Sequence, residues 1–250
     1  MTIPRLSPHA EALPRVGVSQ LPLAPLTRRY RSLWTDLSGE IKETEQEAPV
    51  HPLLDAAHSA FVRGTLILTP RGPVAIEDLL PGDKVVTAAH GPLAISWIGS
   101  MTLRPEAQGS GPRLTRIMAD AFGMGRPIAD LMAGPGARLL GRPRHLRDRL
   151  GSDHVLTPAH VMADGQNTFC VIPRQTVTLY HLCLRRHAVI TANGLEVESF
   201  HPGAGFDRDC GAETLRRFLS LFPHIHTLQD FGPLAHLRLP LDTPDTLDVA

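Results

Sequence analysis

The stretch from residue 61 to residue 99 constrains the fold more than any other part of this chain. Its apolar runs are short and rich in β-branched residues, and turns containing proline and glycine separate them, which favours strands over helices. We expect strands at Thr65–Thr69, Val74–Ile76 and Lys84–Thr87, with turns at Pro70–Pro73 and Pro81–Asp83. The core architecture therefore begins here, as a series of closely spaced strands.

Composition agrees with a fold built from short strands. The 250 residues include 23 prolines and 21 glycines, whereas aromatic residues make up only 5%, which favours many turns over a helical bundle. A hydrophobic content of 42% is enough for a real core, in one domain with tails or in two small domains. The 25 basic and 25 acidic residues balance, so no overall charge points to nucleic acid or to an acidic partner.

Cysteine and histidine usage gives no sign of a cofactor. The chain has three cysteines, Cys170, Cys183 and Cys210. Their odd number and the lack of a CxxC pair argue against a disulfide framework, so we expect these cysteines to be buried in a core as small hydrophobic side chains. The 13 histidines form no HExxH motif and no close Cys/His cluster. We therefore expect no metal site and no cofactor.

The sequence also lacks common targeting signals. No apolar run approaches the roughly 20 residues that cross a bilayer, and Met1–Arg5 does not begin a signal peptide of the usual layout. We expect no membrane span, and a protein that is cytoplasmic or is secreted by a non-classical route.

We divide the chain into three parts: a Pro-rich, partly disordered N-terminal extension (1–57), a main domain (58–204), and a C-terminal helix and tail (205–250). In the extension, Leu26–Trp34 predicts a short helix and Ser38–Glu47 a solvated acidic stretch. We favour a mobile tail or linker. The alternative is a docking segment that packs Leu33 and Trp34 onto the main domain.

The second half of the main domain continues the β pattern. Phe169–Ile172, Val177–Leu184 and Ala188–Ala192 predict strands, and the strong apolar face of Val177–Leu184 suggests that it crosses the core. Asn193-Gly194 is the strongest hairpin signal in the chain. Beyond it, an amphipathic helix is predicted by the spacing of Leu215, Phe218, Leu219 and Phe222, ahead of Pro223.

Three blocks of this sequence resemble the Hint superfamily, the all-β fold shared by hedgehog autoprocessing domains and inteins. Among these proteins they resemble the bacterial Hint domains that are often attached to secreted, repeat-bearing proteins of alphaproteobacteria. The resemblance covers roughly residues 59–204 and the following helix, and implies short, strongly curved strands, an added C-terminal helix and an irregular N-terminal extension. The blocks are Gly64 to Gly99, Pro158-Ala159 to Gly165, and His181 to Gly203.

The resemblance also implies a chemistry. In active Hint domains the first residue is a Cys or Ser that attacks the preceding carbonyl, and a histidine in a Thr/Ser-x-x-His block protonates the departing nitrogen. Here Ala60 occupies the first position. Aligning Asp130–Met132 with the family places Gly134 at the hydroxyl position and Ala137 at the histidine position. The resemblance therefore implies a domain that is degenerate at its nucleophile.

Three other residues are candidates for a surviving reaction. Ser59 lies one position early and needs a register slip, which would turn its side chain to the other face. His160 completes Thr157-Pro158-Ala159-His160, which fits Thr-x-x-His literally but lies in a later block of the family. His187 matches a histidine that lies near the reaction centre in active relatives, although we favour a structural role in fixing the Asn193-Gly194 hairpin.

Our main hypothesis is a Hint-domain protein that lacks self-cleavage and acts as a structural or binding module. The alternative is a residual autoproteolytic N–O acyl shift by Ser59 with His160 or His187. A third is anion or nucleic-acid binding through Arg142–Arg149, which we favour least because no aromatic residues interleave with the arginines. The sequence identifies no partner, and a protein partner is compatible with it.

Overall fold

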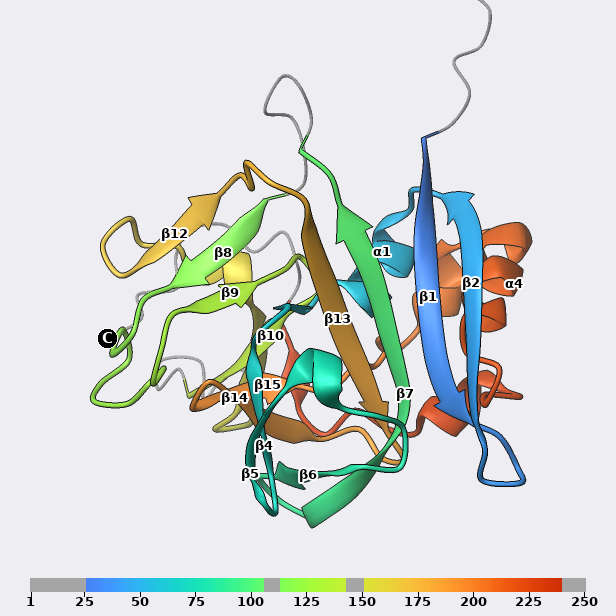
Figure 1. Ribbon diagram of the computed structural model, residues 1–250, viewed down its shortest axis with the longest axis horizontal. Coiled ribbons are helices and arrows are strands. Elements are labelled where there is room, and N and C mark those ends of the chain that lie inside the picture. Colours follow the sequence, from blue (N-terminus) through green and yellow to red (C-terminus); the bar gives the residue numbers. More distant parts are fainter. Residues whose placement is uncertain (1–25, 106–112, 143–150, 240–250) are drawn as a thin grey trace, which may run out of the picture.

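The computed structural model describes residues 26–105, 113–142 and 151–239, and its strands far outnumber its helices (Figure 1). The strands are β1 Thr27–Thr35, β2 Ile41–Pro49, β3 Phe61–Val62, β4 Leu66–Thr69, β5 Gly72–Ala75, β6 Lys84–Thr87, β7 Gly91–Leu103, β8 Leu114–Ile117, β9 Leu131–Ala133, β10 Arg138–Gly141, β11 Val155–Pro158, β12 Thr168–Val171, β13 Val177–Leu184, β14 Val189–Ala192, β15 Leu195–Glu198 and β16 Leu237–Arg238. The helical elements are α1 Pro52–His58, η1 Ile76–Asp78, η3 Ala159–Met162, α3 Phe206–Asp209, α4 Ala212–Ser220 and η4 Leu228–Phe231. This is an all-β fold with an added C-terminal helix.

The long strand β7 connects the parts of the sheet. Its first half pairs with β6, and its second half pairs with β13 on one side and with β1 on the other (Figure 1). The main path of the sheet runs in the order β12-β8-β9-β3-β13-β7-β6-β14-β15-β10-β11-β16. Strands from distant parts of the sequence are therefore neighbours in the sheet. The short strand β3, for example, lies between β9 and β13.

Buried side chains form two large clusters. The first surrounds Ala60, Phe61 and Ile67. In the second, Trp97 stacks on Phe222 with ring centroids 4.3 Å apart, and its indole Nε1 donates a hydrogen bond to the Leu221 carbonyl at 2.7 Å. The residues that follow α4 thereby pack on Trp97 of β7, and Phe218 of α4 belongs to the same cluster.

Several expected elements are confirmed. The structure places β4, β5 and β6 within one or two residues of the predicted strands, and Val177–Leu184 forms β13, whose residues 181–184 are all buried. Asn193 and Gly194 connect β14 and β15 as the predicted hairpin. No helix in the described residues is long and apolar enough to span a membrane.

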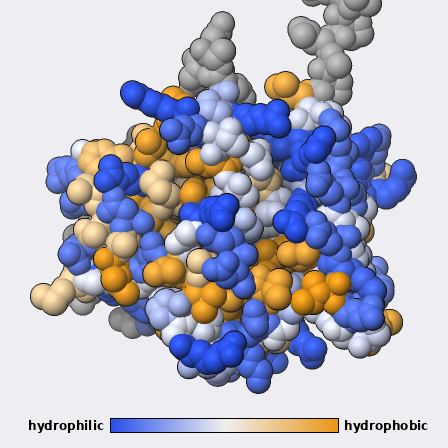
Figure 2. All heavy atoms as spheres, in the orientation of Figure 1, coloured by the Kyte–Doolittle hydropathy of each residue, from blue (hydrophilic) through white to orange (hydrophobic). Residues whose placement is uncertain are grey.

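The N-terminal segment differs from the expectation over the part that the structure describes. Residues 27–35 form strand β1 and not a helix, because Tyr30 and Ser32 are buried at a spacing of two while β1 pairs with β7. The acidic stretch forms β2, whose Glu43 and Glu45 pair with Arg31 and Arg29 across the hairpin. Figure 2 shows the hydrophilic surface over this hairpin, on the right.

The hairpin is nevertheless packed onto the domain. Leu33 and Trp34 contact the two core clusters, in agreement with the alternative of a docking segment. The Tyr30 hydroxyl donates a hydrogen bond to Asp55 Oδ1 in α1 at 2.7 Å. A mobile tail is therefore wrong for residues 26–57; residues 1–25 lie outside the described residues, and the boundaries at 57 and 204 stay predictions.

We expect Tyr30→Ala to lower the free energy of unfolding by about 3–5 kcal/mol, because it empties a fully buried aromatic position. Leu37→Ala is the matched control, since Leu37 is fully exposed and its loss should change stability by less than about 0.5 kcal/mol. Urea unfolding of the full chain measures both. Equal, small effects would show that β1 contributes little to the domain.

Candidate functional site

The junction between α1 and β3 lies at the centre of the site that the resemblance implies. Ser59 and Ala60 are fully buried there. The Ala60 N–H donates to the Tyr180 carbonyl at 2.9 Å, and the Ser59 carbonyl accepts a hydrogen bond from the Gly136 N–H at 3.0 Å. Both the N–H and the carbonyl of the peptide group between Ser59 and Ala60 thus have a backbone hydrogen-bond partner.

The loop between β9 and β10 approaches this peptide so closely that only glycine fits. A Cβ atom at Gly134 would lie 2.1 Å from the Ser59 carbonyl oxygen, and one at Gly136 would lie 2.2 Å from the Ala56 carbonyl oxygen. Both distances are far inside van der Waals contact. The glycine at position 134, where the resemblance implies a hydroxyl residue, is therefore required by the packing of the backbone.

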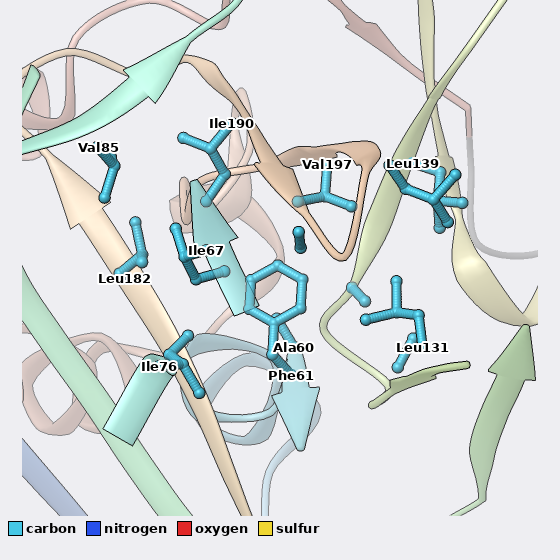
Figure 3. Close-up of a cluster of buried hydrophobic side chains, with 14 of the residues drawn as sticks. Ala60, Phe61, Ile67, Ile76, Val85, Leu131, Leu139, Leu182, Ile190 and Val197 are labelled. Atoms are coloured by element: carbon cyan, nitrogen blue, oxygen red, sulfur yellow. The ribbon is translucent and has the colours of Figure 1, made fainter. Parts of the chain in front are cut away.

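Ala60 and Ala137 are buried among hydrocarbon groups. Both belong to the first core cluster, together with Ala133 and Ala159, and the Ala137 carbonyl accepts a hydrogen bond from the Ala159 N–H at 2.9 Å. Figure 3 shows Ala60 and Phe61 among apolar side chains that carry only carbon. The positions expected for a nucleophile and for a histidine are thus filled by methyl groups in the core.

Ser59 is held by the same loop. Its Oγ accepts a hydrogen bond from the Gly136 N–H at 3.2 Å, so one donor is shared between the hydroxyl and the carbonyl of Ser59. Among the described residues, no hydrogen bond joins Ser59 to a histidine. His160 is exposed on η3 and lines a cavity together with Gly136. The structure thus places His160 in the same cavity wall as the loop that holds Ser59.

His187 has a different environment from the one expected. Its Nδ1 accepts a hydrogen bond from the Ala235 N–H at 2.8 Å, and its Nε2 lies 2.9 Å from Glu198 Oε1. The expected role of His187 at the Asn193-Gly194 hairpin is therefore wrong. Asn193 itself fixes that hairpin, because its Oδ1 accepts from the Leu66 N–H at 2.8 Å and its amide donates to the Asp130 carbonyl at 3.1 Å.

A buried charge cluster, which the sequence did not indicate, surrounds Glu198. Arg238 Nε donates to Glu198 Oε1 at 2.8 Å, whereas Arg138 Nε lies 3.7 Å from Oε2. Burial alone would raise the pKa of the Glu198 carboxyl, but His187 and Arg238 outweigh burial and hold that pKa below its ordinary value. Burial, together with the charge of Arg238, lowers the pKa of Arg138 to about 10, so its guanidinium remains charged at neutral pH.

This cluster lines a cavity of about 660 Å³, here called the Arg138 cavity. Its walls are formed by the start of α1, the Pro135-Gly136 loop, His160 of η3, and residues between Glu198 and Cys210. Gly136 belongs both to this wall and to the Ser59 contact. The Arg138 cavity therefore lies against the loop that packs on the Ser59–Ala60 peptide.

Three buried histidines on β13, α1 and the segment after β15 are held neutral. Burial lowers the pKa of His58 to about 4, of His181 to about 3 and of His201 to about 4. His181 and His201 line the Arg138 cavity, whereas His58 packs between Tyr30 and Trp97. At neutral pH none of the three adds a positive charge.

The remaining sequence candidates lie away from this site. Arg142 pairs with Glu196 at 2.8 Å, and residues 143–149 of the arginine run lie outside the described residues. Cys183 is buried as expected, whereas Cys170 is exposed on edge strand β12, so the expectation of a core residue is wrong for Cys170. Within the described ranges, no group of three or more His, Cys, Asp or Glu residues is arranged to hold a metal ion.

Comparison with known proteins places these residues in a family. A family model described as the Hint domain matches residues 59–204. The solution structure of a bacterial intein-like domain from Clostridium thermocellum is similar over 57% of this chain and 99% of that chain, with 15% identity and a TM-score of 0.38. No curated protein matches the sequence significantly.

We expect Gly134→Ala to destabilise the protein by about 1–3 kcal/mol or more, because its Cβ would collide with the Ser59 carbonyl oxygen. Gly211→Ala is the matched control, since a Cβ at Gly211 would meet no atom within 4 Å and the backbone there has φ −65°. Chemical denaturation compares the two variants. A tolerated alanine at position 134 would contradict the close approach of this loop.

Stability should fall as the pH drops from about 6.5 to 4. In that range the unfolded chain protonates its histidines, whereas folded His58, His181 and His201 stay neutral down to about pH 4 or 3. Each contributes a slope of up to about 1.4 kcal/mol per pH unit. At still lower pH Glu198 is protonated, and the stability that its ionised carboxylate contributes to the folded state is lost too. Urea unfolding at pH 7, 6 and 5 measures the slope, and a flat profile would contradict it.

Proposed function

This chain belongs to the Hint domain family, and we propose that it has lost self-cleavage and serves as a stable structural or binding module. One observation carries the proposal: the positions that the family resemblance assigns to the nucleophile and to the histidine are Ala60 and Ala137, both in an apolar core. An alanine methyl has no lone pair to attack a carbonyl and no proton to transfer.

The arrangement around the peptide also supports the loss of the reaction. Acyl transfer requires the carbonyl of residue 59 to accept a nucleophile from the side chain of residue 60. Here that carbonyl oxygen is held by the Gly136 N–H, a donor that would suit a developing oxyanion, but no attacking group faces it from position 60. The scaffold for binding the junction is thus retained without the reactive side chain.

The alternative is residual cleavage by Ser59 with His160 or His187. In that reaction Ser59 Oγ would attack the His58 carbonyl carbon, its proton would pass to a histidine, and the Ser59 nitrogen would leave as a free amine, giving an ester. Two observations favour this second candidate: the Gly136 N–H donates to Ser59 Oγ, and Gly136 and His160 line the same cavity. The engaged Nδ1 of His187 leaves that histidine without a basic nitrogen for the step.

The family resemblance extends the proposal to context. The blocks of this chain resemble bacterial Hint domains of secreted alphaproteobacterial proteins, so we include a secretion-associated role in the proposal. A module that does not cleave itself would stay covalently joined to whatever precedes it in the chain. It would then act by binding, through its surface or its cavities.

A cleavage assay of the full chain with a folded fusion at its N-terminus tests the proposal. We expect the intact mass to stay unchanged during incubation with dithiothreitol or hydroxylamine, because no ester or thioester forms for these nucleophiles to attack. Time-dependent cleavage near residues 58–60 would overturn the proposal. In that case Ser59→Ala identifies the nucleophile: loss of cleavage would establish the Ser59 alternative, and persistence would exclude it.

A further inference from the structure

We propose that the Arg138 cavity binds a small monocarboxylate, with the carboxylate on the Arg138 guanidinium and an apolar body against the surrounding side chains. This proposal deepens the binding role proposed above and rests on it. The two proposals can be contradicted separately, because a failure to bind a carboxylate would not affect the proposed loss of self-cleavage.

The first argument is charge. Two guanidinium groups, those of Arg138 and Arg238, share one carboxylate, that of Glu198. Arg238 makes the close contact, with Nε at 2.8 Å from Oε1 and Nη2 donating to the His201 carbonyl at 2.6 Å. Arg138 reaches the carboxylate only at 3.7 Å. Among the described residues, no carboxylate lies closer than 3.7 Å to the Arg138 guanidinium, and a largely buried charge without a close partner is unfavourable unless an anion binds beside it.

Within the part of the chain that the structure describes, no other carboxylate supplies that counter-charge. Asp55 also lines the cavity, but it forms an ion pair with Arg28 and accepts the Tyr30 hydroxyl. His181 and His201 are uncharged at neutral pH, as described above. The described lining holds Arg138, Arg238, Glu198 and Asp55, and Arg28 beside the cavity neutralises Asp55. Three arginines thus face two carboxylates, and the one excess positive charge fits a singly charged anion better than a doubly charged phosphate.

The second argument is the geometry of donors. Arg138 uses Nη1 to donate to the Leu239 carbonyl at 3.1 Å, which anchors the side chain beside the cavity. A guanidinium presents its N–H groups in a planar fork that matches a carboxylate. His181 accepts the Leu182 N–H at Nδ1, so its neutral ring carries the proton on Nε2, and this buried ring lines the same cavity. The Arg138 guanidinium is thus fixed in place before a ligand arrives.

The third argument is the rest of the wall. A volume of about 660 Å³ lies within the range of small-molecule sites. The apolar lining comes from several separate segments, and includes Leu53, Pro135, Phe200 and Phe206. Mostly apolar walls with few fixed polar groups are typical of ligand pockets. A carboxylate joined to an apolar body is the class of ligand that fits both the Arg138 guanidinium and the apolar lining.

Calorimetric titration of the full chain with phenylacetate, at pH 7.5 in low-salt buffer without other carboxylates, tests the proposal. We expect saturable binding, at least about tenfold weaker binding of the neutral isostere phenylacetamide, and no tighter binding of inorganic phosphate. A second titration uses N-acetyl-glycyl-phenylalanine with a free or an amidated carboxyl. It distinguishes a peptide C-terminus from a small free acid as the source of the bound carboxylate. Tighter binding of the free peptide than of phenylacetate indicates the peptide, and the reverse indicates the acid.

Arg138→Gln should weaken phenylacetate binding at least about tenfold. Arg142→Gln is the matched control, because Arg142 pairs with Glu196 outside the cavity and its loss should leave binding unchanged. Equal affinity for phenylacetate and phenylacetamide, no binding of phenylacetate, or full affinity in folded Arg138→Gln would overturn the proposal. If Arg138→Gln does not fold, the comparison of acid with amide on the unaltered chain still decides.

Discussion

The close approach of the Gly134–Gly136 loop to the Ser59–Ala60 peptide is the contact on which the rest of the structure depends. It joins the end of α1 to the β9–β10 connection, and the next residues of each segment enter the sheet. The Ala60 N–H extends the same contact to β13 at Tyr180. A side chain at Gly134 or Gly136 would separate these elements, so the backbone geometry itself fixes the position of the junction.

If this domain has lost its reaction, as we propose, the contact explains how the domain remains stable without it. Replacing a reactive side chain by a methyl group at positions 60 and 137 removes polar atoms from a buried place and leaves hydrocarbon against hydrocarbon. Burying hydrocarbon is favourable, whereas a buried polar group needs a hydrogen-bonding partner. A polar cluster lies instead in the wall of the Arg138 cavity, which the same loop also lines.

Much of the fold could be predicted from the sequence, because turns and short strands are encoded locally. Lys84–Thr87 and Val177–Leu184 have clear patterns, and the apolar spacing of the C-terminal helix is equally clear. Strand β1 could not be predicted, because its pattern also fits a short helix and only its pairing with β7 decides between them. The intrinsic preference of a segment for helix or strand thus decides its structure less than such a long-range pairing does.

The candidate site was predictable only in part. The resemblance assigns Ala60 and Ala137 to the nucleophile and histidine positions, and this assignment stays a prediction. The cluster of Arg138, Glu198 and Arg238 could not be predicted, because its members lie far apart in the chain and each resembles a surface charge when read alone. The environment of His187 likewise depends on Ala235, a backbone donor 48 residues away that carries no sequence signal.

Native-state hydrogen exchange of the Ala60 amide tests most directly whether the Ser59–Ala60 peptide is an inert part of the core. That N–H is buried and bonded to the Tyr180 carbonyl, so it should exchange only through global unfolding, with the denaturant dependence of the whole domain. Fast exchange that does not depend on denaturant would mean that the junction opens locally. That result would contradict the account of a junction locked within a scaffold.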